Sequence, residues 1–405
     1  MIRRWDRYLQ PRLRWGLAIA AIFWIVWLIT CFAGHGNRDA NGQVIGTDHA
    51  AFYTAGHLLA TNHGATLYDF PDLTEFRQKQ QQLLQVPQFL DPIRNPPFYA
   101  VCYRTTCGLP YLASLLIWTG IGFTCLLLAL RLLEMPTSSV PWVLSFAPVL
   151  ATVTFGQNTF LSLVIFALGY QCYRRSLPTW AGVAFGLLLY KPQLLAGVFF
   201  WLLFTWRKNF RVGIGIAFIT ILLCCISYFW LRIETESWLR HFPQIAQYNK
   251  FEYYNVHSIR GFVALLLGKS PYLESTCNVV GLLIGATMIF LVVRRFPHHF
   301  PIQFATIVLA TLWASPHTMI YSWTLAIIPA GLLWYHVPNL RPTWRVLFAI
   351  AWWTFWLSTP LTLFQQRTLG VAVQISTPIL AWCTTMVGIA LWKESWNQDS
   401  NWINR

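Results

Sequence analysis

Long apolar runs alternate with short polar or charged breaks along almost the whole chain. A helix needs about 20 mainly apolar residues to cross the hydrocarbon core of a bilayer. Some runs between residues 140 and 205 are only about 13 to 16 residues long, so those segments should be broken, locally thin the bilayer or pack in a crowded bundle. The hydropathy pattern predicts about twelve spans near residues 16–33, 109–130, 140–155, 159–172, 177–190, 193–205, 212–230, 277–293, 301–314, 319–334, 346–360 and 372–391.

The first run, GLAIAAIFWIVWLITCFA (residues 16–33), has two interpretations. It could be a signal peptide, but no small-residue cleavage site is obvious and similar runs recur, so we expect a retained anchor. With 56% hydrophobic and only 11% charged residues, the chain is predicted to be an all-α polytopic membrane protein. No internal repeat or low-complexity tract divides it, so residues 1–405 are read as one domain.

The basic residues favour one orientation. Short loops that retain Lys and Arg face the cytoplasm, which places both termini there and leaves two long segments outside, 34–108 and 231–276. The net charge of +15 then reflects topology and does not indicate a nucleic-acid partner. We therefore expect a multi-pass plasma (inner) membrane protein whose working face is periplasmic or extracellular.

The first outside segment contains helical patterns. DHAAFYTAGHLLA places Phe52, Ala55, Leu58 and Leu59 on one helical face, and PDLTEFRQKQQQLLQ begins with a good cap and continues in helix formers. Both are predicted to lie along the membrane surface. The prolines of DPIRNPPFYA then predict an extended return to the next span.

Asp48 stands at the start of the first of these helices and has two interpretations. An aspartate here could simply cap the helix by accepting hydrogen bonds from free backbone amides. It could also be a general base that takes a proton from an attacking hydroxyl group at the membrane surface. The two roles are compatible.

Four other polar motifs fall at the outside ends of predicted spans: FGQNTF, YKPQ, NVHSIRGF and SPHTMIY. Each has a simple structural alternative: a turn, a lysine that extends to the interface, interfacial histidines or a solvated arginine. All four motifs, however, are predicted to lie on the same side of the membrane. Cations grouped there favour a site for an anionic lipid headgroup, because they stabilise phosphate through charge-assisted hydrogen bonds. The residues concerned are Gln157, Asn158, Lys191, His257, Arg260 and His317.

Other chemistry finds little support. His49, His57 and His63 are spaced by eight and six residues, which fits no common helix-borne metal pattern, so no metal or other cofactor is predicted. No Walker loop, GxGxxG or GxSxG motif is present. Cys102 and Cys107 could form a disulfide in an oxidising compartment or remain free thiols.

The motifs TDHAAFYTAGHLLATNHGATLYD, RNPPFYA, FGQNTF, YKPQ and SPHTMIY occur in an order that resembles glycosyltransferase family 87. These DUF2029-type, polyprenol-phosphate-mannose-dependent membrane enzymes belong to the GT-C fold. The resemblance implies transfer of a hexose, with mannose the expected sugar, from a polyprenyl-phosphate donor to a lipid or envelope-glycan acceptor on the outer face, with inversion.

The same resemblance implies roles for individual residues. Asp48 would be the catalytic base, and His317 would lie near the reacting sugar or the departing phosphate. Lys191, Arg260, His257, Gln157 and Asn158 would contact the donor, while Tyr53, Tyr68, Asp69 and Asn95 would position substrate.

Ser322 departs from the family pattern, which has an aspartate after the tyrosine of SPHTMIY. Two other functions stay open, of which only the second, a degenerate transferase, is motivated by Ser322. A transporter or flippase would place ionisable residues near the bilayer midplane and show paired repeats, neither of which the sequence favours. A degenerate transferase retained as a partner subunit would lack activity on its own.

Overall fold

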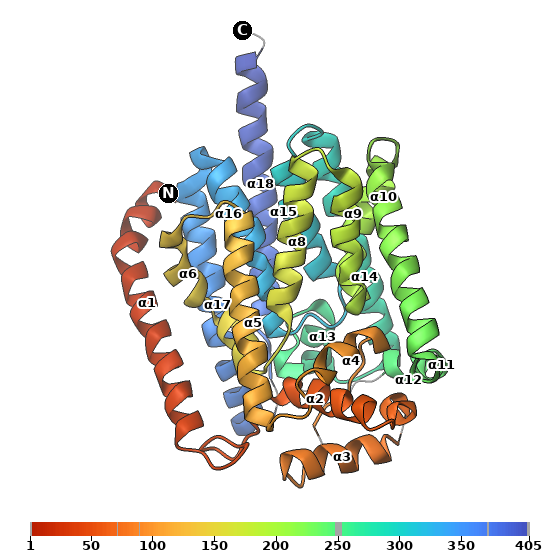
Figure 1. Ribbon diagram of the computed structural model, residues 1–405. Coiled ribbons are helices and arrows are strands. Elements are labelled where there is room, and N and C mark those ends of the chain that lie inside the picture. Colours follow the sequence, from red (N-terminus) through yellow and green to blue (C-terminus); the bar gives the residue numbers. More distant parts are fainter. Residues whose placement is uncertain (1, 71, 89, 248–252, 371, 403–405) are drawn as a thin grey trace.

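The computed structural model of the protein describes residues 2–70, 72–88, 90–247, 253–370 and 372–402. The described residues form helices joined by loops, and their only β pairing is three isolated bridges. Most helices run roughly along one direction of the molecule, and a layer of shorter helices closes one end (Figure 1). The all-helical prediction is confirmed.

Within the described residues, five helices are long and apolar enough to cross a membrane. A sixth span results if the bent pair α6 (Val140–Leu144) and α7 (Ala147–Thr154) counts as one. The protein is therefore polytopic, as predicted. The five helices are α1 (Ile2–Phe32), α5 (Tyr111–Leu132), α10 (Ala196–Trp230), α14 (Pro271–Arg295) and α17 (Arg341–Leu369).

The predicted count of about twelve spans is not supported. The predicted spans 193–205 and 212–230 both fall within one candidate span, Pro192–Trp230, which consists of a 3₁₀ turn followed by α10. The backbone of α10 leaves helical geometry at Asn209 (φ −116°, ψ 16°). Other predicted spans are short helices with many buried residues, such as α15 (Phe300–Ala314). Hydropathy registers an apolar helix whether its neighbours are lipid or protein, so it overcounts buried segments.

Four further α-helices and several 3₁₀ turns complete the described part of the bundle. They are α8 (Thr159–Arg174), α9 (Pro178–Gly186), α16 (Ile327–His336) and α18 (Ser376–Trp402), with 3₁₀ turns η2 (Thr137–Ser139), η3 (Leu187–Tyr190), η4 (Pro192–Leu195), η6 (Ile320–Ala326) and η7 (Pro338–Leu340).

The closing layer comes mainly from the two long loops. Its elements are α2 (Thr47–Ala60), η1 (Gly64–Tyr68), α3 (Thr74–Leu84), α4 (Pro97–Arg104), α11 (Arg232–Arg240), α12 (Phe242–Gln247), η5 (Tyr253–Asn255) and α13 (Ile259–Leu267). Figure 1 shows α2, α3, α4 and α11 together at the end of the bundle opposite the C-terminus of α18.

The two helices predicted in the first loop are present as α2 and α3, but α2 is not a surface helix. Ten of its residues are buried, including Phe52, Ala55, Leu58 and Leu59. The extended segment before α4 ends at Pro96, and Pro97 then starts that helix, which the prolines had not suggested. Cys102 and Cys107 are both free thiols.

The α6–α7 pair is bent by 70° at Ser145 and Phe146. Three tryptophan indoles donate to groups at this break: Trp24 to the Leu144 carbonyl at 2.8 Å, Trp356 to the Ser145 carbonyl at 3.0 Å, and Trp352 to Ser145 Oγ at 3.1 Å. The broken helix end is thus satisfied by side chains of α1 and α17, as an apolar setting requires.

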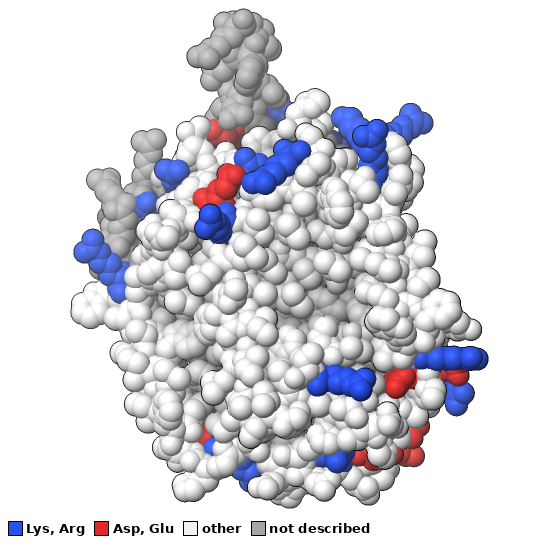
Figure 2. Space-filling model, in the orientation of Figure 1, with Lys and Arg blue, Asp and Glu red and all other residues white. Residues whose placement is uncertain are grey.

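On the face of the molecule shown in Figure 2, charged residues gather towards the two ends. Figure 2 shows Lys and Arg dominating the end from which α18 emerges, a broad central band without charge, and both signs mixed at the opposite end. A belt free of charge is the surface expected to face hydrocarbon. The closing layer of short helices lies at the mixed-charge end (Figure 1).

Candidate active site

A cavity of about 390 Å³ lies between the closing layer and the ends of the bundle helices. Its walls come from α2, the segment before α4, the break between η3 and η4, and the loop between α15 and η6. Its polar lining includes Asp48, Asp91, Arg94, Asn95, Gln157, Lys191 and His317.

Two glycines allow the start of α2 to pack closely against the turn between α7 and α8. Gly46 (φ 72°) precedes α2 and Gly156 (φ 66°) follows α7, and both have the left-handed backbone that favours glycine. A Cβ at Gly156 would lie 2.7 Å from His49 Cβ, so a side chain there would push α2 away. Beside them, the Phe155 carbonyl accepts from the Asp48 amide at 2.9 Å, which fixes Asp48 against the α7–α8 turn.

Three side chains form the base wall: Asp48, Gln157 and Lys191. Gln157 Nε2 donates to Asp48 Oδ2 at 2.6 Å, and Lys191 Nζ donates to Gln157 Oε1 at 3.0 Å. A neutral amide thereby joins a carboxylate to a cation. All three residues line the cavity, so this wall presents both signs of charge to a bound molecule.

The positions of these residues bear on their simple structural interpretations as a helix cap, an interfacial lysine and a turn. Asp48 lies inside the first turn of α2 and not at its cap, which is Gly46, and no side-chain cap bond forms there. Lys191 does not extend to the interface, because its ammonium lies 5.7 Å from the centre of the Tyr321 ring in the cavity. Gln157 does follow a turn between short helices, yet its side chain also contacts Asp48.

The environment of Asp48 changes its acidity. Burial, and next the Asp91 carboxylate, raise the pKa of Asp48 to about 6, against the lowering effects of Gln157, Arg94 and Lys191. A carboxylate of this pKa is ionised at neutral pH and more basic than an ordinary aspartate. That combination suits a general base.

A second part of the site, called the histidine wall, consists of His317 in the cavity lining with Arg260 and Glu274 behind it. His317 lines the cavity, whereas Arg260 is buried behind it with Nη1 3.3 Å from each ring nitrogen. Arg260 Nη2 donates to Glu274 Oε2, and Tyr253 donates to Glu274 Oε1 at 2.8 Å. Arg260 is therefore not placed to contact a donor in this cavity directly.

Three further predicted residues, Asn95, Asn158 and Tyr68, form hydrogen bonds in the structure around the cavity. Asn95 lines the cavity and donates through Nδ2 to the Tyr190 carbonyl at 2.7 Å, while its own carbonyl accepts from the Tyr68 hydroxyl at 2.6 Å. Asn158 donates to the Tyr99 hydroxyl and lines a separate small pocket. Tyr68 and Asn158 thus contact the framework of the site.

The remaining predicted residues lie elsewhere. His257 is fully buried, with Nδ1 2.7 Å from Ser376 Oγ, and it does not line the cavity. Tyr53 donates to the Leu109 carbonyl at 2.6 Å and packs inside the closing layer. Asp69 is exposed after η1 and also does not line the cavity.

Asp91 and Arg94 were missed by the sequence reasoning. Both line the cavity and lie 3.7 Å apart at Asp91 Oδ2 and Arg94 Nη2. The signal was present, because both residues belong to the DPIRNPP segment, whose prolines predict an extended backbone. Rigid extended backbone is a good support for charged side chains in a cavity.

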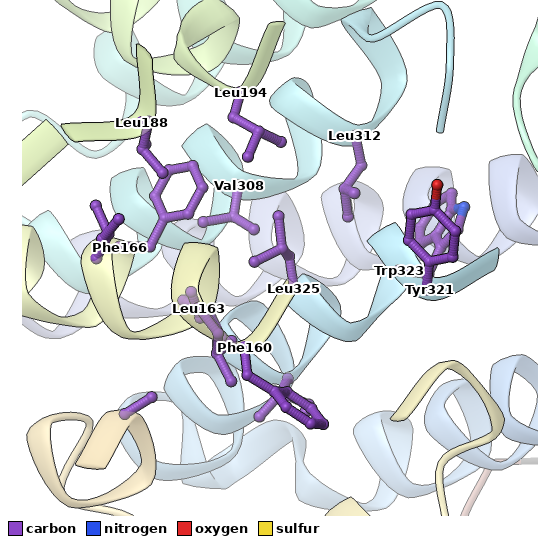
Figure 3. Close-up of a cluster of buried hydrophobic side chains, with 14 of the residues drawn as sticks. Phe160, Leu163, Phe166, Leu188, Leu194, Val308, Leu312, Tyr321, Trp323 and Leu325 are labelled. Atoms are coloured by element: carbon purple, nitrogen blue, oxygen red, sulfur yellow. The ribbon is translucent and has the colours of Figure 1, made fainter. Parts of the chain in front are cut away.

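A cluster of apolar side chains lies next to the cavity and shares several residues with its lining. Leu194, Leu312, Tyr321 and Leu325 line the cavity, and Figure 3 shows them beside the buried side chains of Phe160, Leu163, Phe166, Leu188, Val308 and Trp323. Side chains from α8, η3, η4, α15 and η6 meet in this cluster. Such close packing fixes the loops that carry the polar residues.

Fold and cavity together define an integral multi-pass membrane protein with a carboxylate and cations in a cavity at one end of its helical bundle. More than half of the chain, residues 94–316, matches the model of glycosyltransferase family 87, and the chain belongs to this family. It is therefore a membrane glycosyltransferase, an enzyme that uses a sugar donor and an acceptor.

The matched range includes Asn95, Gln157, Asn158, Lys191, His257 and Arg260, whereas Asp48 and His317 lie outside it. No curated protein matches the chain, and no solved structure matches it.

Proposed function

We propose that the protein transfers a hexose, specifically mannose, from a polyprenyl-phosphate donor to a lipid or envelope-glycan hydroxyl group, with inversion. The observation that carries this proposal is the base wall, where Asp48 and Lys191 are joined through Gln157 in a cavity that also holds Arg94. In such a reaction a carboxylate can accept the proton of the attacking hydroxyl group, and cations in the same cavity can neutralise the departing phosphate.

In the proposed reaction the acceptor oxygen attacks the anomeric carbon while Asp48 accepts the hydroxyl proton. The bond from that carbon to the phosphate oxygen breaks, and its electron pair leaves with the lipid phosphate. Attack from the side opposite the phosphate inverts the anomeric centre. Asp48, with its pKa raised to about 6, can take the proton near neutral pH.

Lys191 and Arg94 are the proposed partners of the departing phosphate. A phosphate needs neutralisation of charge more than it needs a proton, and cationic side chains in a poorly solvated cavity supply it. Asn95 lies beside them in the cavity and would position the sugar. Asn158 and Tyr68 would act indirectly, through the framework that they contact.

We assign the basic end of the molecule to the cytoplasm and the cavity to the outer face of a plasma membrane. The distribution of Lys and Arg in Figure 2 supports this assignment. Both termini would then be cytoplasmic, and the helical bundle would be of the GT-C type. A polyprenyl-phosphate sugar would reach the cavity from the surrounding bilayer.

The test is sugar transfer from radiolabelled polyprenyl-phosphate-mannose by the purified full-length protein in membranes containing candidate acceptors. Transfer by the wild type and none by Asp48→Asn at equal protein level would support the proposal. No transfer by the wild type would refute the mannose donor, and movement of the intact lipid between leaflets would favour a flippase.

A further inference from the structure

His317 is held by a short pairing between two loops that are distant in sequence. The His257 amide donates to the Thr318 carbonyl at 2.8 Å, and Ser258 Oγ donates to the Pro316 carbonyl at 3.2 Å. Ser258 also caps α13, since its hydroxyl accepts from the Gly261 amide. The start of α13 is thereby fixed against the loop that carries His317.

This pairing places the Arg260 guanidinium directly against the His317 ring. Its Nη1 lies 3.3 Å from both Nδ1 and Nε2, so the cation contacts the ring as a whole and not one nitrogen. A guanidinium group has donors only and stays protonated. A second cation in contact with it, half-buried at the cavity wall, would be strongly disfavoured.

Arg260 is itself held in place from behind. Only 6% of its side chain is exposed, and it pairs with Glu274 in the first turn of α14. The Tyr253 hydroxyl donates to the other carboxylate oxygen at 2.8 Å. Separation of the two partners would leave a charge buried without its counter-charge, which is strongly unfavourable. The pair therefore holds the Arg260 side chain in one position.

The groups that face His317 come from several elements. Arg260 and Arg94 are the cations that act on the ring, and burial together with these two lowers the pKa of His317 to about 3. Glu274 and Tyr253 stand behind Arg260. The other elements around the cavity contribute Asp48, Asp91, Tyr190, Lys191 and Tyr321.

We propose that the Glu274–Arg260 pair is a positioning device that keeps His317 uncharged, so that His317 binds sugar hydroxyl groups and not the donor phosphate. A neutral imidazole offers one N–H donor and one acceptor, which suits a hydroxyl group. Phosphate recognition is then left to Lys191 and Arg94. This inference rests on the proposed function for its ligand, whereas the charge state of His317 can be measured without any ligand.

The first experiment is histidine NMR of the full-length protein in lipid nanodiscs without donor. The His317 signal is identified by its loss in His317→Gln. We expect His317 to remain neutral down to a pH of about 5.5, one unit below the ordinary histidine value. Arg260→Gln should raise its titration midpoint by at least about one unit, while Arg260→Lys should not.

The matched control is Arg232→Gln, which removes an exposed arginine that pairs with Glu236. It should leave the His317 titration unchanged. Protonation of wild-type His317 near the ordinary pH, or an unchanged midpoint in folded Arg260→Gln, would overturn the inference. Its failure is distinct from failure of the proposed function, because the titration needs no sugar donor.

The second experiment compares two replacements of His317 in sugar transfer. His317→Gln keeps a neutral donor and acceptor and should lower transfer by at most about tenfold, the effect of one weakened hydrogen bond. His317→Lys places a cation against Arg260 and should lower it by at least about a hundredfold. The reverse order, with the lysine variant more active, would make this position a phosphate site and overturn the inference.

Discussion

The two walls of the cavity use charged residues in opposite ways. The base wall presents Asp48 and Lys191 to the cavity, separated by the Gln157 amide. The histidine wall keeps Arg260 and Glu274 behind His317, and only the ring reaches the cavity. Charge that faces the cavity can take part in a reaction, whereas charge behind the wall can hold a neutral group in place. Substitutions should therefore separate activity from stability.

The largest expected effect is the loss of transfer in Asp48→Asn. Asparagine keeps the shape of the side chain but cannot accept the proton, so transfer should fall by about 10²–10⁴-fold. Unfolding of the purified variant, followed by intrinsic fluorescence, should be nearly unchanged. Transfer within about twofold of the wild type would remove Asp48 as the base.

Glu274→Ala should show the opposite pattern. It leaves the Arg260 cation buried without its carboxylate, which should cost about 3–5 kcal/mol of folding free energy. Thermal unfolding in detergent would measure this loss. Glu236→Ala is the control, because it breaks an exposed pair with Arg232 and should cost at most about 1 kcal/mol. Equal stability of the two variants would contradict the difference between the walls.

Lys191→Met should reduce transfer by about 10²–10³-fold, since the proposed mechanism loses one charged donor to the departing phosphate. Lys191→Arg keeps the cation and should recover part of the activity. The expected signature is a lower kcat with a smaller change in KM, because the charge on the phosphate develops in the transition state. A pure KM effect would assign Lys191 to ground-state binding.

The wild-type pH profile should have an acid limb near pH 6 from Asp48 and an alkaline limb near pH 7 from Lys191, because burial lowers the pKa of the Lys191 ammonium to about 7. The proposed mechanism needs the ionised form of Asp48, so transfer should fall about tenfold per pH unit below the raised pKa of about 6. Folding responds with the opposite sign: because this pKa is raised in the folded state, protonation of Asp48 favours folding between about pH 4 and 6. A profile that stays flat down to pH 5 would contradict this assignment.

Tyr68→Phe should have the smallest effect. It removes the hydroxyl that donates to the Asn95 carbonyl, and a buried carbonyl left without its donor costs about 1–3 kcal/mol of stability. Transfer should fall by less than about tenfold, because Asn95 retains its bond to the Tyr190 carbonyl. Asp69→Ala, an exposed neighbour outside the cavity, should change neither transfer nor thermal unfolding.

The sequence allowed cavity residues to be predicted where a polar motif stood at the end of an apolar run on the expected outer face of the membrane. Asp48, Gln157, Lys191 and His317 met these conditions and all line one cavity. His257 and Arg260 met the same conditions but lie behind the wall, because sequence position does not reveal which side of a loop faces inward. Asp91 and Arg94 were missed because a proline-rich segment had been interpreted only as a connection.

The fold was predictable in class but not in detail. Periodicity located α2 and α3, yet it could not show that α3 and α4 cover α2, so a buried helix was expected at the surface. Segment hydropathy likewise could not distinguish a helix such as α15, with twelve buried residues, from one that faces lipid. In both cases the sequence shows that a helix has an apolar face but not whether that face packs against protein or lipid. Only the packing of the whole chain determines this.

The tryptophans at the α6–α7 bend bear on the order in which the chain can assemble. Ser145 and Leu144 are synthesised long before Trp352 and Trp356, which lie more than 200 residues later. Until α17 arrives, the bend has only the indole of Trp24 to satisfy its exposed carbonyls. This pair of helices should therefore insert late or wait near the lipid headgroups during biogenesis, and a chain truncated before α17 should leave it accessible to water.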